Sequence, residues 1–220
     1  MSSFTRPELH NCALVTIDVQ SEVLDGQPLE IPGSSAALPA IARLAEAFRA
    51  RGRPIVHLVR LYRSDGSNVD LCRREAVING WKALAPGTPG AELAAELRGD
   101  HAGLDAELLL RGEVQGIGEH EVVIYKPRWG AFYETPLHAH LTRLGVSTLA
   151  FCGFNFPNCP RTSIYQASER DFRVVLATDA VSGLYERGRE ELADIGVGLV
   201  TAGELIDSLS RSPAGAAVNG

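Results

Sequence analysis

Long apolar runs are missing from this chain. No stretch approaches the ~20 consecutive apolar residues that a membrane-spanning helix needs, so we expect no membrane as a partner. The first twenty residues also lack a signal peptide's order of a basic end, an apolar core and a small-residue cleavage site. Their apolar run Cys12–Ile17 is short and leads directly into Asp18. We therefore expect a cytoplasmic protein.

Positive charge and cysteine are also scarce. Lys and Arg number 21 against 27 Asp and Glu, which gives a net charge of -6. Nucleic acids attract surfaces rich in Lys and Arg, so this balance argues against a nucleic-acid partner. The four cysteines, Cys12, Cys72, Cys152 and Cys159, form no C-x-x-C pair and no zinc-finger spacing. In a reducing cytosol we expect free thiols, one of which could act as a nucleophile.

Linkers, repeats and a dinucleotide fingerprint are absent as well. No Pro/Gly/Ser-rich linker divides the apolar segments, so residues 1–211 are predicted to form a single domain. Residues 212–220 are expected to be a disordered tail. A nicotinamide cofactor is disfavoured, because DVQSE stands at 18–22 where Gly-x-Gly-x-x-Gly would follow the first strand. We expect no cofactor.

What the sequence does contain is an alternation of short apolar runs and amphipathic stretches. Strands are predicted at 12–17, 53–58, 121–125, 147–152, 173–177 and 197–200, and helices at 34–51, 135–144, 160–171 and 186–195. Near-continuous apolar strands indicate a parallel sheet that is covered on both faces. The chain is therefore predicted to be an α/β protein with a doubly wound sheet.

Residues 61–120 fit this alternation poorly. They carry turn-forming sequences such as SDGS at 64–67 and PGTPG at 86–90, and further glycines near 112–118. We expect a long excursion with one or two short helices, which acts as a lid or as a subunit contact.

Three ionisable residues stand where predicted strands end. Asp18 ends the first strand, Lys126 follows the third, and Cys159 begins a helix six residues after Gly153. In open parallel sheets, ligands bind outside the carboxyl ends of the strands, so we expect these side chains to meet at one edge. Pro160 suits a first helical turn, which would turn free N–H groups and a positive helix dipole toward the sulfur.

This set contains the parts needed for acyl transfer. The helix start and Lys126 would both favour the thiolate form of Cys159. Asp18 could accept the thiol proton and later return it to a leaving amine. Each residue also has an ordinary explanation: a core thiol, a helix cap or a solvated surface charge. Their shared position at one edge is what favours a nucleophile, a base and an anion stabiliser.

Four segments of the chain form a larger pattern. They are LVTIDVQ (14–20), PIVHLVR (54–60), YKPRWGAFYETPLHAHL (125–141) and FCGFNFPNCPRTSIYQASERDFRVVLATDAVSG (151–183). In this order they resemble the isochorismatase-like cysteine hydrolase family, and they cover most of the chain outside 61–120. The resemblance implies a Rossmann-like, mainly parallel six-stranded sheet with helices on both faces. It also implies a catalytic triad at Asp18, Lys126 and Cys159.

The same resemblance implies an oxyanion hole before the cysteine. Its donors would be the backbone N–H groups of Asn155 and Cys159, shaped by a cis peptide between Phe154 and Asn155. Members of the family without the cysteine hydrolyse a vinyl ether. The presence of Cys159 therefore favours cleavage of a carbon–nitrogen bond.

Two departures from the family's nicotinamidases bear on the substrate. Their Asp-x-His…His metal site has no counterpart in VHLVRLYRSDGSNVDLCRRE (56–75), where His57 lies inside a strand, so we expect no metal. Their Thr-x-x-Cys is replaced by FPNC at 156–159. The segments DGSNVDLCRREAV (65–77) and GFNFPNCPRTSIYQASERDF (153–172) most resemble the streptothricin hydrolases of this family, which open the streptolidine lactam of an antibiotic.

The predicted function is that of a metal-independent cysteine amidohydrolase. It would cleave an amide or lactam bond of a small molecule through a thioester, with streptothricin as one candidate and antibiotic resistance as the role. The alternatives are a nicotinamidase-like or carbamoyl-amidase-like hydrolase, a vinyl-ether hydrolase and a catalytically silent binding protein. Candidate substrate-binding residues are Gln20, Arg60, Trp129, Phe132, Phe154, Phe156 and Asn158. A homo-oligomer is expected from the resemblance and from the long excursion.

Overall fold

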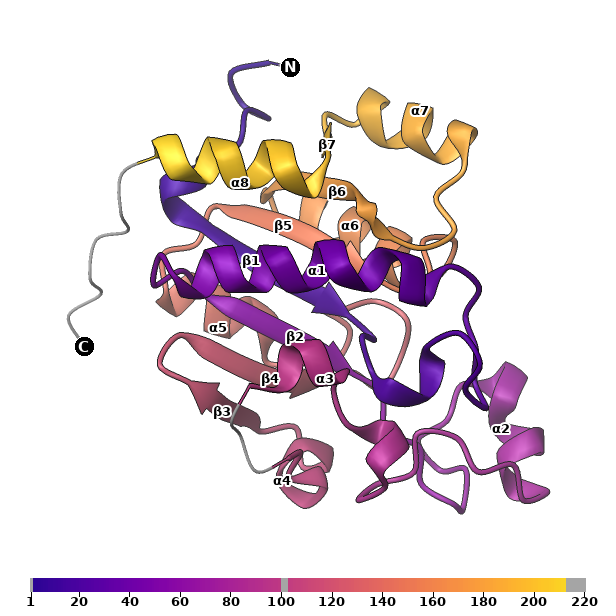
Figure 1. The fold of residues 1–220 in the computed structure, drawn as a ribbon. Coiled ribbons are helices and arrows are strands. Elements are labelled where there is room, and N and C mark those ends of the chain that lie inside the picture. Colours follow the sequence, from indigo (N-terminus) through magenta and orange to yellow (C-terminus); the bar gives the residue numbers. More distant parts are fainter. Residues whose placement is uncertain (1, 100–102, 213–220) are drawn as a thin grey trace.

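The computed structural model describes residues 2–99 and 103–212, so most of the expected disordered tail lies outside the described residues. Within these ranges seven strands form one sheet in the order β3-β4-β2-β1-β5-β6-β7 (Figure 1). The strands are β1 (Cys12–Ile17), β2 (Ile55–Val59), β3 (Val114–Gly118), β4 (Glu121–Tyr125), β5 (Thr148–Gly153), β6 (Arg173–Val181) and β7 (Gly198–Val200). The pairings are parallel except for that of β3 with β4, which confirms the predicted mainly parallel α/β sheet.

The helices are α1 (Ser34–Arg49), α2 (Leu71–Ile78), α3 (Ala95–Arg98), α4 (Ala106–Leu110), α5 (Leu137–Arg143), α6 (Cys159–Ser168), α7 (Glu186–Asp194) and α8 (Ala202–Arg211), with 3-10 turns η1 (Leu9–Asn11), η2 (Ser21–Val23) and η3 (Pro89–Ala91). Residues 61–120 contain more regular structure than the sequence predicts: α2, η3, α3, α4 and also β3. The seventh strand, β3, is missed because VQGIG has two glycines and only half-buried apolar side chains. In the described part of the chain, no helix is both long and apolar enough to cross a membrane.

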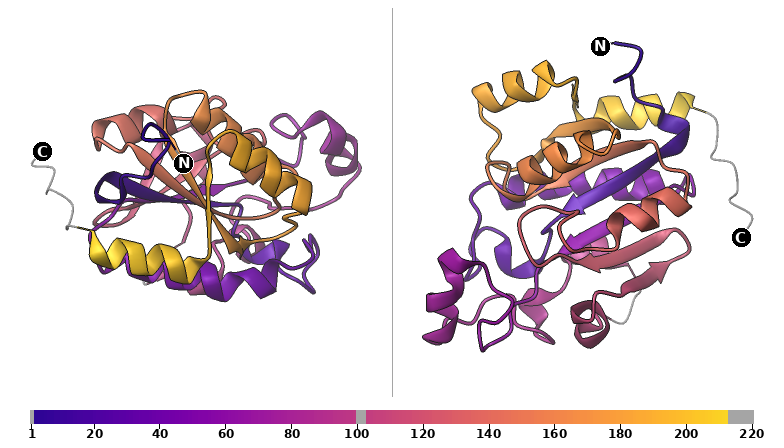
Figure 2. Two further views of the ribbon diagram at one scale, coloured as in Figure 1. Left: turned by 90° about the horizontal axis from the view of Figure 1, so that it is seen from above. Right: turned by 180° about the vertical axis from the view of Figure 1, so that it is seen from behind.

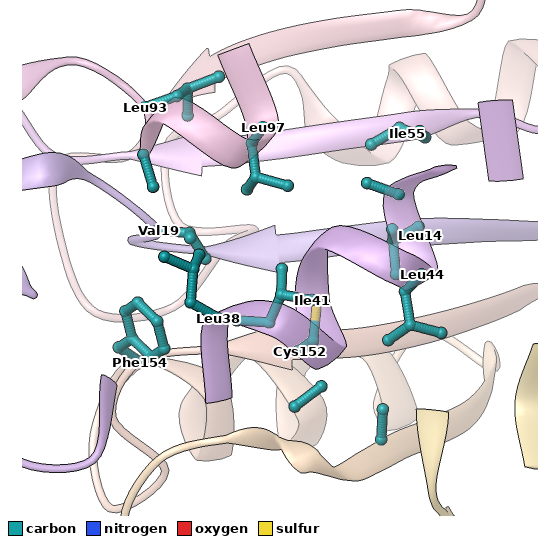
Figure 3. Packing of buried hydrophobic residues seen from close by; sticks show 14 of the residues in the cluster. Leu14, Val19, Leu38, Ile41, Leu44, Ile55, Leu93, Leu97, Cys152 and Phe154 are labelled. Carbon is teal, nitrogen blue, oxygen red and sulfur yellow. The ribbon is translucent and has the colours of Figure 1, made fainter. Parts of the chain in front are cut away.

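Helices cover both faces of the sheet. Helices α1 and α8 pack on one face, whereas α5 and α6 lie on the other (Figure 2). Every residue of the central strand β1 is buried, as a parallel strand covered on both faces requires. Figure 3 shows Leu44 of α1 beside Leu14 of β1, and Leu38 of α1 beside Val19.

The turn out of β5 brings the nucleophile loop beside β1. Gly153 pairs with Ile17 at the carboxyl end of both strands, and the N–H of Phe154 donates to the Ile17 carbonyl at 2.8 Å. Gly153 has φ 116, and a Cβ atom added there would lie 2.2 Å from the Ile17 carbonyl oxygen. Only glycine allows this close approach without strain. The turn at Gly153 therefore leads residues 154–158 past the end of β1, next to Asp18.

Candidate active site

An ion pair joins the ends of β1 and β4. The Lys126 ammonium donates to Asp18 Oδ2 at 2.9 Å, and Lys126 is fully buried while Asp18 is 6% exposed. Strand β2 lies between these strands and holds both residues. The Asp18 N–H donates to the Leu58 carbonyl at 2.9 Å, and the Lys126 N–H donates to the Val59 carbonyl at 3.0 Å. Parallel pairing therefore fixes the carboxylate and the ammonium relative to each other.

Cys159 is the first residue of α6, and its side chain faces the same cavity as Asp18. This cavity has a volume of about 450 Å³. Its lining residues are Asp18, Val23, Pro28, Leu29, Glu30, Ile31, Arg60, Tyr62, Arg73, Trp81, Leu84, Phe154, Asn155, Asn158 and Cys159. The cavity lies at the carboxyl ends of the parallel strands, as expected for this kind of sheet. In Figure 1 the arrowheads of β1 and β2 point toward the corner of the molecule that holds α2.

The surroundings of the Cys159 thiol raise its pKa, which favours the protonated form at neutral pH. Burial raises the pKa of Cys159 to about 11, and the Asp18 carboxylate raises it further, although Lys126 and Arg60 lower it. The expected thiolate is therefore disfavoured in the free protein, because loss of hydration raises the pKa more than Lys126 and Arg60 lower it. Asp18 Oδ1 is buried and accepts no hydrogen bond from the described residues. The thiol thus lies beside the Asp18 carboxylate, whose Oδ1 is not engaged by Lys126.

Two backbone N–H groups beside the thiol are not used elsewhere. The N–H groups of Phe154, Phe156 and Asn158 each donate to a backbone carbonyl, at 2.8, 2.8 and 3.1 Å. Those of Asn155 and Cys159 donate to no acceptor among the described residues. The expected cis peptide between Phe154 and Asn155 is wrong, since every described peptide bond is trans, the form that non-proline residues favour.

The cavity wall contains only some of the predicted substrate-binding residues. Arg60, Phe154 and Asn158 line it, as Asn155 does. Phe132 and Phe156 do not line it. Phe132 stacks on Phe172 at a centroid distance of 5.9 Å, and Phe156 packs edge-on against Tyr185 at a centroid distance of 5.4 Å.

Two further candidates serve as supports rather than as cavity wall. The Arg73 guanidinium lies over the Trp129 ring, with its Cζ atom 6.0 Å from the ring centroid. The buried Gln20 amide donates to the carbonyls of Arg60 and Ala91 at 2.9 and 2.6 Å and accepts from the Arg60 N–H at 2.9 Å. Gln20 therefore ties the end of β2 to residues 61–120, and its polar atoms are occupied.

The sequence did not point to several lining residues from the excursion and from 23–31. Tyr62, Arg73, Trp81 and Leu84 come from residues 61–120, and the turn 28–31 closes the opposite side. No periodic signal marks them. Arg60 directly follows β2, and the segment after it was the available hint, because chain that leaves the carboxyl end of a parallel strand often borders the site.

His57 lies inside the sheet, on the side of α1. Its ring nitrogens bond to Thr16 Oγ1 at 2.8 Å and to Glu121 Oε1 at 2.6 Å, and Arg49 donates to the same carboxylate at 2.6 and 2.7 Å. This is a structural network across β1, β2 and β4. Among the described residues, no cluster of three His, Cys, Asp or Glu side chains is arranged to hold a metal ion.

The fold and the site together define a class: an α/β hydrolase with a cysteine and an aspartate–lysine pair at one cavity. A model of the isochorismatase domain matches residues 12–195, so the chain belongs to the isochorismatase family, as predicted. The crystal structure of an isochorismatase family protein from Desulfovibrio vulgaris superposes with a TM-score of 0.77 at 33% identity, covering 91% of this chain and 99% of that chain.

Three relatives illustrate the range of the family. A ureidoacrylate amidohydrolase from Methylobacterium radiotolerans is 27% identical, over 94% of this chain and 84% of its own length. A streptothricin hydrolase from Streptomyces noursei is 31% identical, over 76% of this chain and 53% of its own length. A probable inactive nicotinamidase from Arabidopsis thaliana is 29% identical, over 91% of this chain and 97% of its own length. The family thus includes amidohydrolases, which act on carbon–nitrogen bonds other than peptide bonds.

Proposed function

We propose that this chain is a cysteine-dependent amidohydrolase that cleaves the carbon–nitrogen bond of a small amide or lactam. One observation carries the proposal: Asp18, paired with Lys126, and the thiol of Cys159 face the same cavity. A carboxylate beside a protonated thiol is suited to attack with simultaneous proton transfer.

In the first half-reaction, the Cys159 sulfur attacks the amide carbonyl carbon while its proton passes to Asp18. The carbonyl oxygen becomes an oxyanion, for which the N–H groups of Asn155 and Cys159 are the available donors. The carbon–nitrogen bond then breaks, Asp18 returns the proton to the leaving nitrogen, and a thioester remains. The Lys126 ammonium, 2.9 Å from Asp18 Oδ2, holds the carboxylate in place and stabilises negative charge in the site during the transfer.

In the second half-reaction, Asp18 takes a proton from water, which attacks the thioester carbonyl. The carbon–sulfur bond breaks, the thiolate recovers the proton, and the carboxylic acid product leaves. For a lactam, the amine released in the first step stays tethered to the acyl group. The streptolidine lactam of streptothricin remains a candidate substrate, supported by the relative of that name.

A panel of small amides and lactams, streptothricin among them, tests the proposal. Mass spectrometry follows the release of an amine from linear amides and the gain of one water by lactams. The intact protein is measured in parallel to detect an acyl adduct at Cys159. We expect Cys159→Ala to abolish turnover and the adduct while the circular dichroism spectrum is unchanged. The matched control is Cys72→Ala, which removes an exposed thiol and should retain full activity. Full activity in Cys159→Ala would reject the mechanism.

One relative favours a second candidate, a catalytically silent protein on the same fold, because the Arabidopsis thaliana relative is named a probable inactive nicotinamidase. This alternative predicts no turnover of any amide and no acyl adduct in the wild-type protein. The adduct measurement separates the two.

The location and the assembly state belong to the same proposal. We propose a cytoplasmic homo-oligomer; Leu71 and Ile78 of α2 are 81% and 58% exposed, which suits a subunit contact. Light scattering on the purified full chain tests the assembly state, and a monomer at micromolar concentration would reject it.

A further inference from the structure

Two arginines that the proposed mechanism does not use line the same cavity as Cys159. Arg60 directly follows β2 and is 2% exposed. Arg73 comes from α2, and its side chain is 39% exposed. The Gln20 side-chain amide bonds to both the N–H and the carbonyl of Arg60, which fixes the backbone of Arg60. A buried, fixed guanidinium in a ligand cavity calls for a partner of opposite charge.

Among the described residues, Asp70 is the one carboxylate within 4 Å of either guanidinium group. Arg60 Nη2 donates to Asp70 Oδ2, and the Tyr62 hydroxyl donates to the same oxygen at 3.3 Å. Arg73 donates to the Tyr62 hydroxyl at 2.8 Å and lies 3.8 Å from Asp70. Arg60 therefore has the close contact, and Arg73 is left with a longer one.

A charge count leaves this part of the site positive. Lys126, Arg60 and Arg73 carry three positive charges, against two negative charges on Asp18 and Asp70, and the thiol is neutral. A further lining carboxylate, Glu30, is exposed and accepts a hydrogen bond from the Gly26 N–H at 2.7 Å. It therefore stays hydrated at the rim and compensates little inside the cavity.

Arg60 also has donors without acceptors. Its Nε and Nη1 atoms are buried and make no hydrogen bond within the described structure. A buried donor left unpaired destabilises the free protein, and an acceptor from a bound molecule would remove that cost. Guanidinium groups match carboxylate oxygens in both geometry and charge.

From this geometry we infer that the substrate is an acidic amide, whose carboxylate binds at Arg60 and Arg73 while its amide carbonyl lies at Cys159. The inference rests on the proposed function, since it presumes that amides react at Cys159. It deepens that function by naming the substrate class: a neutral or cationic amide of the same size binds less well. Arg60 and Arg73 are specificity residues in this arrangement, and Tyr62 and Asp70 position them.

Two alkylating reagents of nearly equal size test the inference without knowledge of the substrate. Iodoacetate carries a carboxylate where iodoacetamide carries a neutral amide, and both react with the same thiolate. The rates at Cys159 are measured at pH 9 by peptide mass spectrometry on the full chain. The iodoacetate rate is divided by the iodoacetamide rate. This ratio is then divided by the same ratio for 2-mercaptoethanol, a thiol without other charged groups, to give the referred ratio.

We expect the referred ratio to favour iodoacetate about tenfold at Cys159, as one excess charge a few ångströms away would produce. Arg73→Gln should remove most of this preference, and Arg73→Lys should retain it because the charge is kept. The matched control is Arg187→Gln, which neutralises an arginine that is 83% exposed on α7 and should leave the ratio unchanged.

The outcomes separate the two proposals. If iodoacetamide modifies Cys159 but iodoacetate has no advantage, the acidic substrate class is rejected and the nucleophile assignment stands. The same rejection follows if Arg73→Gln and Arg187→Gln change the ratio equally. If neither reagent modifies Cys159 while 2-mercaptoethanol reacts, the thiol is inaccessible from the cavity and the proposed function is rejected together with the inference.

Discussion

Replacing Lys126 by Met should destabilise the protein by about 3–5 kcal/mol, because it strands a buried carboxylate. Lys126 is fully buried, and its ammonium has two acceptors, Asp18 Oδ2 at 2.9 Å and the Arg128 carbonyl at 3.4 Å. At 2.9 Å and an effective dielectric constant of about 20, the attraction between the two charges is about 6 kcal/mol. Desolvation of both ions offsets most of this attraction in the wild-type protein. Removing one partner leaves the other charge buried without compensation, and that desolvation cost then lowers the free energy of unfolding.

A double-mutant cycle measures this coupling. Urea unfolding at pH 7 is compared for Lys126→Met, Asp18→Asn and the double variant. Each single variant should lose about 3–5 kcal/mol, whereas the double variant should lose much less than the sum, with a coupling of at least about 2 kcal/mol. Cys159→Ala is the control, because it alters the same cavity without leaving a buried charge. A loss below about 1 kcal/mol in Lys126→Met, or additive losses in the cycle, would refute the reasoning.

Three further predictions concern other features of the structure. Because the pKa of Cys159 is raised to about 11, its alkylation by iodoacetamide should accelerate about tenfold per pH unit from 7 to 10; a plateau near pH 7 would contradict the burial argument. Burial raises the pKa of Glu121, but hydrogen bonds from Arg49 outweigh it and lower the pKa from 4.5 to about 2. Ionised Glu121 therefore stabilises the fold above pH 4.5 by about 3 kcal/mol, and this contribution disappears as the pH falls toward 2. In urea unfolding, Glu121→Gln should lower the free energy of unfolding more at pH 7 than at pH 3. Gly153→Ala should lose at least about 3 kcal/mol, against about 1 kcal/mol for Gly145→Ala, which also has positive φ but no atom within 4 Å of the added carbon; equal losses in thermal unfolding would contradict the close approach of β5 to β1.

The sequence predicted the sheet well because apolar runs report burial directly. The predicted strands at 12–17 and 121–125 coincide with β1 and β4, and the predicted helix at 34–51 overlaps α1. The positions of Asp18, Lys126 and Cys159 follow from the same signal, since each stands where an apolar run ends or a helix begins. Strand β3 escaped because its glycines and half-buried side chains carry no such pattern.

Side-chain surroundings were harder to predict than positions. The protonation of Cys159 depends on how much water its neighbours exclude, which the residue order does not encode. Gln20 could be read as a ligand, yet its amide is used to join Arg60 to Ala91. Arg73 and Tyr62 were missed because they reach the cavity through a segment without periodic patterning.

The separation of the site residues along the chain has a consequence for how the protein matures. Asp18 and Lys126 are 108 residues apart, and the cysteine helix begins only after β5. All five strands from β1 to β5 must therefore leave the ribosome before the catalytic pocket can form, so chains truncated before α6 should be inert. During refolding, the slow alkylation rate of the native Cys159 thiol should return only when α6 has packed at the cavity. Its return should therefore lag behind the recovery of helical circular dichroism.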